Sequence, residues 1–221
     1  VFADEIIWED TFALDADVLP ETAHGIANEL LEKMVLQAVD AQQFYGTVNA
    51  VAYEAYLEGR VLATVPGELN SAIEDFQAAI DLDPGYVLAY VGLAQALLDQ
   101  LENGNLNNEK RTALEKRAER AVDMARRIDP HSADAMSLFA LLLDNPQLRY
   151  QAWERALELE PDHAMSLFRY AAELRENGLL EDAERLARQA IRLRPADARF
   201  QSELATIREM RTREQETGSS N

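Results

Sequence analysis

The sequence of 221 residues has no cysteine, only three histidines, and few prolines and glycines. Without cysteine it can form no disulfide, no thiolate metal site and no cysteine nucleophile. Seven prolines and nine glycines are few for this length, which favours helices over sheets. No apolar run approaches the roughly 18 to 20 residues of a membrane-spanning helix, and no signal-peptide pattern opens the sequence. Any signal or anchor is therefore expected outside this chain.

Positive charge is scarce in the first half of the sequence. The chain carries 40 acidic and 21 basic residues, a net charge of −19. Residues 1–110 hold 20 acids but only Lys33, Arg60 and Lys110, whereas residues 111–221 hold 20 acids and 18 bases. Such a charge repels phosphate backbones and anionic membrane surfaces. We expect no direct nucleic-acid binding by this region, and membrane association only through an anchor outside it.

Motifs for catalysis, cofactor binding and metal binding are missing. The sequence has no His-Glu-x-x-His, no phosphate-binding glycine loop and no Gly-x-Ser-x-Gly elbow. His24, His131 and His163 are isolated, so we expect solvated or capping loop residues rather than metal ligands. Adjacent carboxylates such as Glu181 and Asp182 indicate a solvated helix face. The expectation is a non-enzymatic protein with no cofactor and no metal.

What the sequence does have is an internal repeat. Four segments share the spacing four, three, five: Ala72-Phe76-Ala79-Pro84, Ala118-Val122-Ala125-Pro130, Arg149-Trp153-Ala156-Pro161 and Ala183-Ala187-Ala190-Pro195. Three of the prolines are followed by a second signature: Tyr90-Leu93-Ala94-Leu97, Met136-Phe139-Ala140-Leu143 and Leu167-Tyr170-Ala171-Leu174. Large residues at i, i+3 and i+7 form an apolar stripe, a small residue admits the paired helix, and proline ends the second helix. Each unit is thus predicted to be two helices.

These signatures resemble the tetratricopeptide repeat, and residues 162–195 look like a full 34-residue example with Gly178 in the inter-helix turn. The resemblance implies an all-α, right-handed superhelix of helix-turn-helix units, preceded by a short extended segment. The expected units are 51–84, 85–130, 131–161 and 162–195, followed by a capping helix at 196–214 and a flexible tail at 215–221. The second unit carries an insertion of about 12 residues, with Asn107 or Asn108 as N-cap of a lengthened helix. The third unit is shortened at Asp144-Asn145-Pro146.

The first fifty residues resemble a domain junction. Residues 5–12 are β-branched and aromatic, so 1–20 is expected to be an extended remnant of an upstream α/β domain, and 21–50 an amphipathic helix with a connector. The segment Ile7-Trp8-Glu9-Asp10-Thr11-Phe12, the following helix and residues 52–60 resemble the junction in CadC-type membrane-anchored transcription regulators, where a TolB-like domain leads into tetratricopeptide repeats. That resemblance implies a periplasmic sensory or interaction region of a bacterial regulator. The alternative is a free-standing, cytoplasmic adaptor or assembly factor that binds a peptide.

A row of residues on the first helices is the candidate peptide-binding groove. Places two, five and nine of each first helix share one face, and successive repeats align them. The candidates in this row are Leu88, Val91, Gln95, Ser137, Leu141, Met165 and Phe168, and Arg175 is a candidate at its rim. Met165 and Phe168 are expected to be the apolar anchors for a protein or peptide partner, unless another part of the chain covers Phe168.

Two segments are candidate surfaces for a homo-oligomer. The N-terminal segment carries Ile7 and Trp8, whose apolar side chains favour burial. The C-terminal helix carries four arginines that are expected to contact the acidic first half, within the chain or in a second copy: Arg199, Arg208, Arg211 and Arg213.

Overall fold

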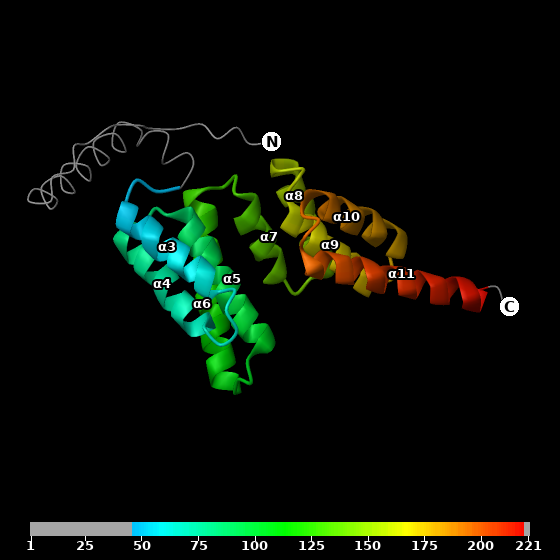
Figure 1. Ribbon diagram of the computed structural model, residues 1–221, viewed down its shortest axis with the longest axis horizontal. Helices are drawn as coiled ribbons and strands as arrows, with labels where there is room; N and C mark the ends of the chain where they lie inside the picture. The colour runs from blue at the N-terminus through cyan, green and yellow to red at the C-terminus, as the bar shows by residue number, and fades with distance from the viewer. Residues whose placement is uncertain (1–45, 219–221) are drawn as a thin grey trace, which may run out of the picture. The chain divides into compact units, whose positions relative to one another are not determined.

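The computed structural model describes residues 46–218, which form nine α-helices and no strand (Figure 1). The helices are α3 (Ala50–Leu62), α4 (Leu69–Leu82), α5 (Val87–Asn103), α6 (Asn108–Ile128), α7 (Ala133–Leu141), α8 (Pro146–Leu159), α9 (Ala164–Glu176), α10 (Leu180–Leu193) and α11 (Ala198–Gly218). The all-α expectation is confirmed over this range. None of these helices combines the length and the apolar character needed to cross a bilayer. The predicted extended segment at 1–20, the helix at 22–38 and His24 lie outside the described residues.

The helices pack as consecutive antiparallel pairs within the unit that begins at Asn49. The pairs are α3–α4, α5–α6, α7–α8 and α9–α10, and α11 packs on α10 and α9. The first helices of neighbouring pairs also touch, α3 on α5, α5 on α7 and α7 on α9. Equivalent positions of the first helices therefore come to lie next to one another, which is the condition for a continuous binding face.

Side-chain caps begin most of the helices. The amide oxygen of Asn49 accepts from the backbone N–H of Val51 and Ala52 at the start of α3. Asn107, Ser132 and Asn145 cap α6, α7 and α8 in the same way. Such caps satisfy N–H groups that have no partner inside the helix, each contributing about 1 kcal/mol. Asn107 is thus the cap of the lengthened helix, and Pro146 occupies the first turn of α8, where its missing N–H costs nothing.

Prolines end the four second helices with one repeated geometry. Pro84, Pro130, Pro161 and Pro195 each follow the C-cap residue of α4, α6, α8 or α10. These C-cap residues have φ between −127° and −142° and ψ between 74° and 96°, an extended conformation. The proline ring excludes the helical conformation for the residue before it. The repeated spacing in the sequence therefore fixes where each pair of helices stops.

Small residues at the repeat positions allow close packing between helices. Ala79, Ala125, Ala156 and Ala190 are completely buried on the second helices. In the first pair, Phe76 of α4 fills the space that two glycines leave open on the neighbouring helices. A Cβ at Gly59 of α3 or at Gly92 of α5 would stand 3.0 Å or 2.5 Å from that ring. The absence of a side chain at these two positions is what admits the aromatic ring.

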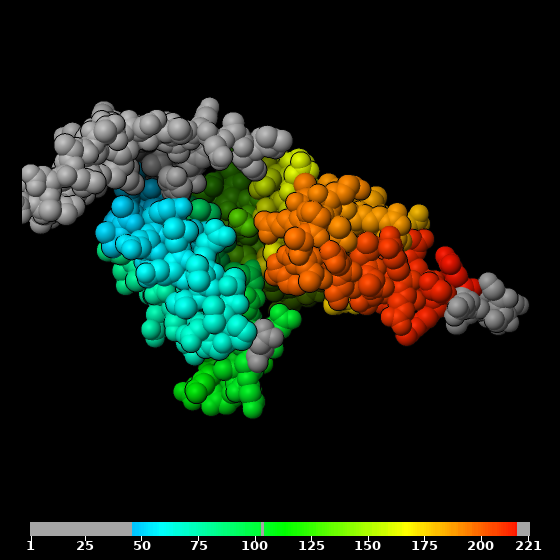
Figure 2. Space-filling view, viewed as in Figure 1, coloured from blue at the N-terminus to red at the C-terminus, as the bar shows by residue number. Residues whose placement is uncertain are grey.

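The described helices depart from a uniform repeat in three places. The insertion lengthens α5 to 17 and α6 to 21 residues, and in Figure 2 the green atoms of their turn extend past those of α3 and α4. The shortened third unit has a first helix, α7, of only nine residues. The last helix, α11, continues to Gly218, so residues 215–218, which the sequence places in a tail, are helical.

Candidate peptide-binding face

The predicted row begins on α5 with two half-buried aliphatic side chains. Leu88 and Val91 pack at the edge of the core cluster formed by α3 to α7. On α7, Leu141 is 40% exposed and is the most accessible apolar member of the row. This part of the row can offer apolar surface to a ligand.

Gln95 and Ser137 are brought together by a residue that the sequence analysis did not single out. Arg169 of α9 donates one guanidinium nitrogen to the Ser137 hydroxyl at 3.3 Å and another to the Gln95 side-chain oxygen. Gln95 in turn donates its amide to Asp99 Oδ1 at 2.6 Å. One arginine therefore ties together α5, α7 and α9, the first helices of three successive pairs. Ser137 is completely buried, so it supports this contact rather than facing a ligand.

Burial shifts the pKa values of the two ionisable groups in this polar cluster, Arg169 and Asp99. It lowers the pKa of the Arg169 guanidinium to about 10, against the opposing effect of the Asp99 and Asp134 carboxylates. Burial also raises the pKa of Asp99 above its usual value, although the hydrogen bond from Gln95 and the charge of Arg169 act the other way. At neutral pH Arg169 stays protonated and provides a fixed cation on this face.

The buried His163 caps α9 and links it to α7. Its Nδ1 accepts from the Ser166 backbone N–H at 3.3 Å and lies 2.6 Å from the Ser166 hydroxyl. In the neutral ring the proton is therefore on Nε2, which lies 2.9 Å from Asp134 Oδ1. Burial works against the Asp134 carboxylate, yet the hydrogen bond and charge of His163 hold its pKa below the usual range. The expectation of a capping role is confirmed for His163, while His131 is exposed.

The two predicted anchors on α9 are partly covered by α11. The rings of Phe168 and the completely buried Phe200 stack with centroids 4.8 Å apart and planes 23° apart. Met165 packs at the edge of the same cluster, which α9, α10 and α11 share. At the rim, Arg175 Nε donates to Glu203 Oε1 of α11 at 2.5 Å. Met165, Phe168 and Arg175 are thus engaged within the chain, which is the outcome foreseen as the alternative for Phe168.

Within residues 46–218, the ion pairs of the α11 arginines are with nearby carboxylates. Arg208 and Arg211 both bind the buried Glu184 of α10, which Arg188 also contacts at 2.6 Å. Arg199 pairs with Asp197 at 2.6 Å, and Arg213 pairs with Glu209 at 2.6 Å. The pairs of Arg208 and Arg211 with Glu184 attach α11 to α10, and the pairs of Arg199 and Arg213 lie at the start of α11 and within it. Pairing with a second copy of the chain stays a prediction.

A further buried pair holds α8 against α9. Arg149 takes the place that alanine holds in the other second helices, and its guanidinium donates to Glu173 Oε1 at 2.7 and 3.1 Å. It also donates to the Leu143 carbonyl at 3.1 Å, near the abrupt turn before α8. The sequence contained a signal for this pair, since Arg149 and Glu173 are charged residues among positions that are otherwise small or apolar. The same signal marks Arg169, whose equivalents in the repeat are Gly92 and Leu138.

Comparisons with known proteins support the fold alone. No protein-family model matches the chain, and no curated protein matches it. Among solved structures, it is similar to TTC0263, a thermophilic TPR protein of Thermus thermophilus, with a TM-score of 0.61 and 18% identity over 84% of this chain and 95% of that one. It also matches a double mutant of MamA RS-1, with a TM-score of 0.48 and 14% identity over 78% and 90% of the two chains. YrrB, a TPR protein with an unusual peptide-binding site, gives a TM-score of 0.41 and 19% identity over 72% and 76%. The last two likenesses are too weak to support an inference, whereas the first agrees with the helix pairs described above. The described helices form a tetratricopeptide-type solenoid.

Proposed function

We propose that this chain is a non-enzymatic module that binds a protein or peptide along its first helices. The observation that supports the proposal is the alignment of α5, α7 and α9, with apolar side chains from α5 and α7 beside the polar cluster around Arg169. Leu88, Val91 and Leu141 offer apolar contact area, and Gln95 and Arg169 offer polar groups that fix the orientation of an extended segment.

The contacts of α11 restrict the part of the row that is open to a ligand. Since α11 engages Met165, Phe168 and Arg175, a ligand is expected to bind first to the α5 and α7 part of the row. It would reach the α9 part only by displacing Phe200. The ligand would then make its apolar contacts with Val91 and Leu141 rather than with Met165 and Phe168 on α9.

Peptides selected from a random display library on the wild-type protein provide a test. Val91→Glu combined with Leu141→Glu should abolish their binding in calorimetric titrations. Leu148→Glu, an equally exposed leucine on the second helix α8, should leave binding unchanged. If the selected peptides bound the double variant as tightly as the wild type, the first helices would be excluded as the binding site.

We further propose that the module is the periplasmic interaction region of a membrane-anchored bacterial transcription regulator. The support is the resemblance of residues 7–12 and 52–60 to that junction, and α3 does occupy the second of these segments as a helix. A β-lactamase fused after Asn221 in the natural gene should confer ampicillin resistance, because the reporter acts only outside the cytoplasm. Sensitive cells with a stable fusion would instead favour a cytoplasmic, free-standing adaptor.

A further inference from the structure

The helix lengthened by the insertion, α6, concentrates positive charge in an acidic protein. It contains seven of the 21 basic residues of the chain: Lys110, Arg111, Lys116, Arg117, Arg120, Arg126 and Arg127. Arg126 stacks on the ring of Phe139, with 3.6 Å from its guanidinium carbon to the ring centroid. Within the described part of the chain, the other six have no carboxylate or hydrogen-bond partner for their side chains.

Most arginines of the C-terminal helices, in contrast, have a counter-ion among the described residues. Nine arginines between residues 149 and 213 each bind a carboxylate of the same chain. The positive charges of the C-terminal helices are therefore mostly used for internal contacts, and among the described residues only Arg192 and Arg194 of this range have no ion pair or side-chain hydrogen bond. Those of α6 remain available for a binding partner.

Four of the free cations share one face of α6. Lys110, Arg117, Arg120 and Arg127 follow the spacing i, i+7, i+10 and i+17, which places them within an arc of about 100°. All four are exposed. We call Lys110, Arg117, Arg120 and Arg127 the basic stripe.

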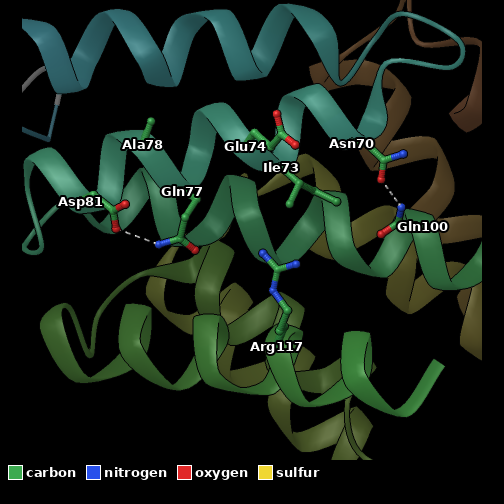
Figure 3. Close-up of a pocket in the computed structure, with 8 residues that line it drawn as sticks. All are labelled: Asn70, Ile73, Glu74, Gln77, Ala78, Asp81, Gln100 and Arg117. Atoms are coloured by element: carbon green, nitrogen blue, oxygen red, sulfur yellow. Dashed lines mark hydrogen bonds between the residues drawn. The ribbon is translucent and has the colours of Figure 1, made fainter. Parts of the chain in front are cut away.

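Arg117 of the basic stripe lines a cleft of about 550 Å³ between α4 and α6 (Figure 3). In Figure 3 the Arg117 side chain extends from α6 toward Ile73 and Gln77 of α4. The opposite wall carries Glu74 and Asp81, but neither pairs with Arg117, and Asp81 accepts from Gln77 at 3.0 Å instead. The cleft is lined by the second helices α4 and α6 and by Gln100 of the first helix α5, and it shares no residue with the proposed face of the first helices.

The mixed composition of the walls favours a polypeptide over a nucleic acid. Gln77 of α4 and Gln100 of α5 are side-chain amides that can bond to peptide N–H and C=O groups. Gln100 donates to Asn70 at 2.6 Å, and its own oxygen has no hydrogen-bond donor among the side chains that the structure describes. Glu74 and Asp81 can accept hydrogen bonds from the backbone N–H groups of a peptide, whereas a phosphate backbone has no such donors.

We propose that the α4–α6 cleft and the basic stripe bind an acidic segment of a partner protein, with carboxylates of the partner on Arg117 and Arg120 and its backbone against the amides of α4 and α5. Charge complementarity supports this occupant. The exposed guanidinium groups fit carboxylates in a bidentate geometry, and no carboxylate of the described chain occupies them.

The test measures fluorescence anisotropy with a labelled peptide of alternating glutamate and glycine, and with the matched glutamine peptide. The wild-type protein should bind the glutamate peptide at low ionic strength and lose it at high salt. Arg117→Ala combined with Arg120→Ala should weaken binding about 10-fold. The control is Arg185→Ala with Arg213→Ala, which removes the same charge from exposed arginines paired with Asp182 and Glu209, and it should bind like the wild type.

Four outcomes overturn the proposal. Equal weakening by both double variants would show a general charge effect, and failure of the wild type to prefer the glutamate peptide would show that no acidic segment binds. Self-association in sedimentation equilibrium that disappears in the Arg117 and Arg120 double variant would assign the basic stripe to a second copy of the chain. Tighter binding of a labelled oligodeoxythymidine, lost in the same variant, would assign it to a nucleic acid.

Discussion

Phe168 of α9 stacks on Phe200 of α11, with ring centroids 4.8 Å apart. This contact joins a first helix of the repeat array to the last helix of the chain. It places the aromatic side chain that looked best suited to anchor a ligand inside an intramolecular cluster, next to Met165 and Leu204. The residue is therefore expected to contribute to stability before it contributes to binding.

Phe168→Ala should lower the free energy of unfolding by about 2 to 4 kcal/mol, because it leaves a cavity beside Phe200. Urea denaturation measures the loss, and Leu141→Ala, an exposed member of the same row, should cost less than about 1 kcal/mol. If both variants were equally stable, the stack would not form in solution, and Phe168 would be open to a ligand.

The positions of the helices were predictable because the repeat signals are local. Each proline fixes the end of a second helix, and Asn107 and Asn145 fix two starts through side chains close in sequence. The third unit was predicted to be shortened at Asp144-Asn145-Pro146, and its first helix, α7, is only nine residues long.

The partners of the charged residues were not predictable by the same argument. Arg169 contacts Gln95, 74 positions away in sequence, and Arg149 contacts Glu173, 24 positions away. Such pairs depend on how successive units stack, which a spacing rule within one unit does not specify. The coverage of Phe168 also depends on the approach of α11, so the sequence left that alternative open.

Gly92→Ala should destabilise the protein, although alanine is normally the better helix former. The new Cβ would lie 2.5 Å from the Phe76 ring, so the expected cost is about 1 to 3 kcal/mol instead of a gain of about 1 kcal/mol. Chemical denaturation of Gly92→Ala in the background of Phe76→Leu provides the check, since a smaller neighbour should remove most of the cost. A cost that persists unchanged in that background would mean that another contact is responsible.

Tyr86→Phe should be neutral or should stabilise the protein by up to about 1 kcal/mol. Tyr86 is completely buried, and its hydroxyl has no hydrogen-bond partner among the described residues. Burial raises the pKa of this hydroxyl, as expected of a group removed from water. The thermal unfolding midpoint of Tyr86→Phe should equal or exceed that of the wild type. Tyr170→Phe, which loses a hydrogen bond to Glu154, should not have a higher midpoint than the wild type. A clearly lower midpoint for Tyr86→Phe would show that the Tyr86 hydroxyl has a hydrogen-bond partner in solution.

Glu184 is the residue through which α10 holds α11. Its carboxylate is buried, and it accepts from Arg188 of its own helix and from Arg208 and Arg211 of α11. Burial alone would raise its pKa, but the hydrogen bonds from Arg208 and Arg211 and the charge of Arg188 hold the pKa below its usual range. A carboxylate with a lowered pKa in the folded state stabilises the protein at pH values above the pKa of the unfolded chain, about 4.3, and loses that effect as the pH falls through the folded pKa.

Glu184→Gln should therefore lower the free energy of unfolding by about 1 to 3 kcal/mol at pH 7, because glutamine can accept fewer bonds and carries no charge for the arginines. The difference from the wild type should shrink as the pH falls from about 4.3, the pKa of the unfolded chain, through the lowered pKa of the folded state, below which the wild-type carboxylate is protonated as well. Urea denaturation of both proteins across this pH range measures the gap, and Glu181→Gln, an exposed neighbour, should behave like the wild type throughout. A gap that stayed constant down to the lowest pH would mean that glutamine costs stability through its shape, and that the charge of Glu184 does not hold α11 in place.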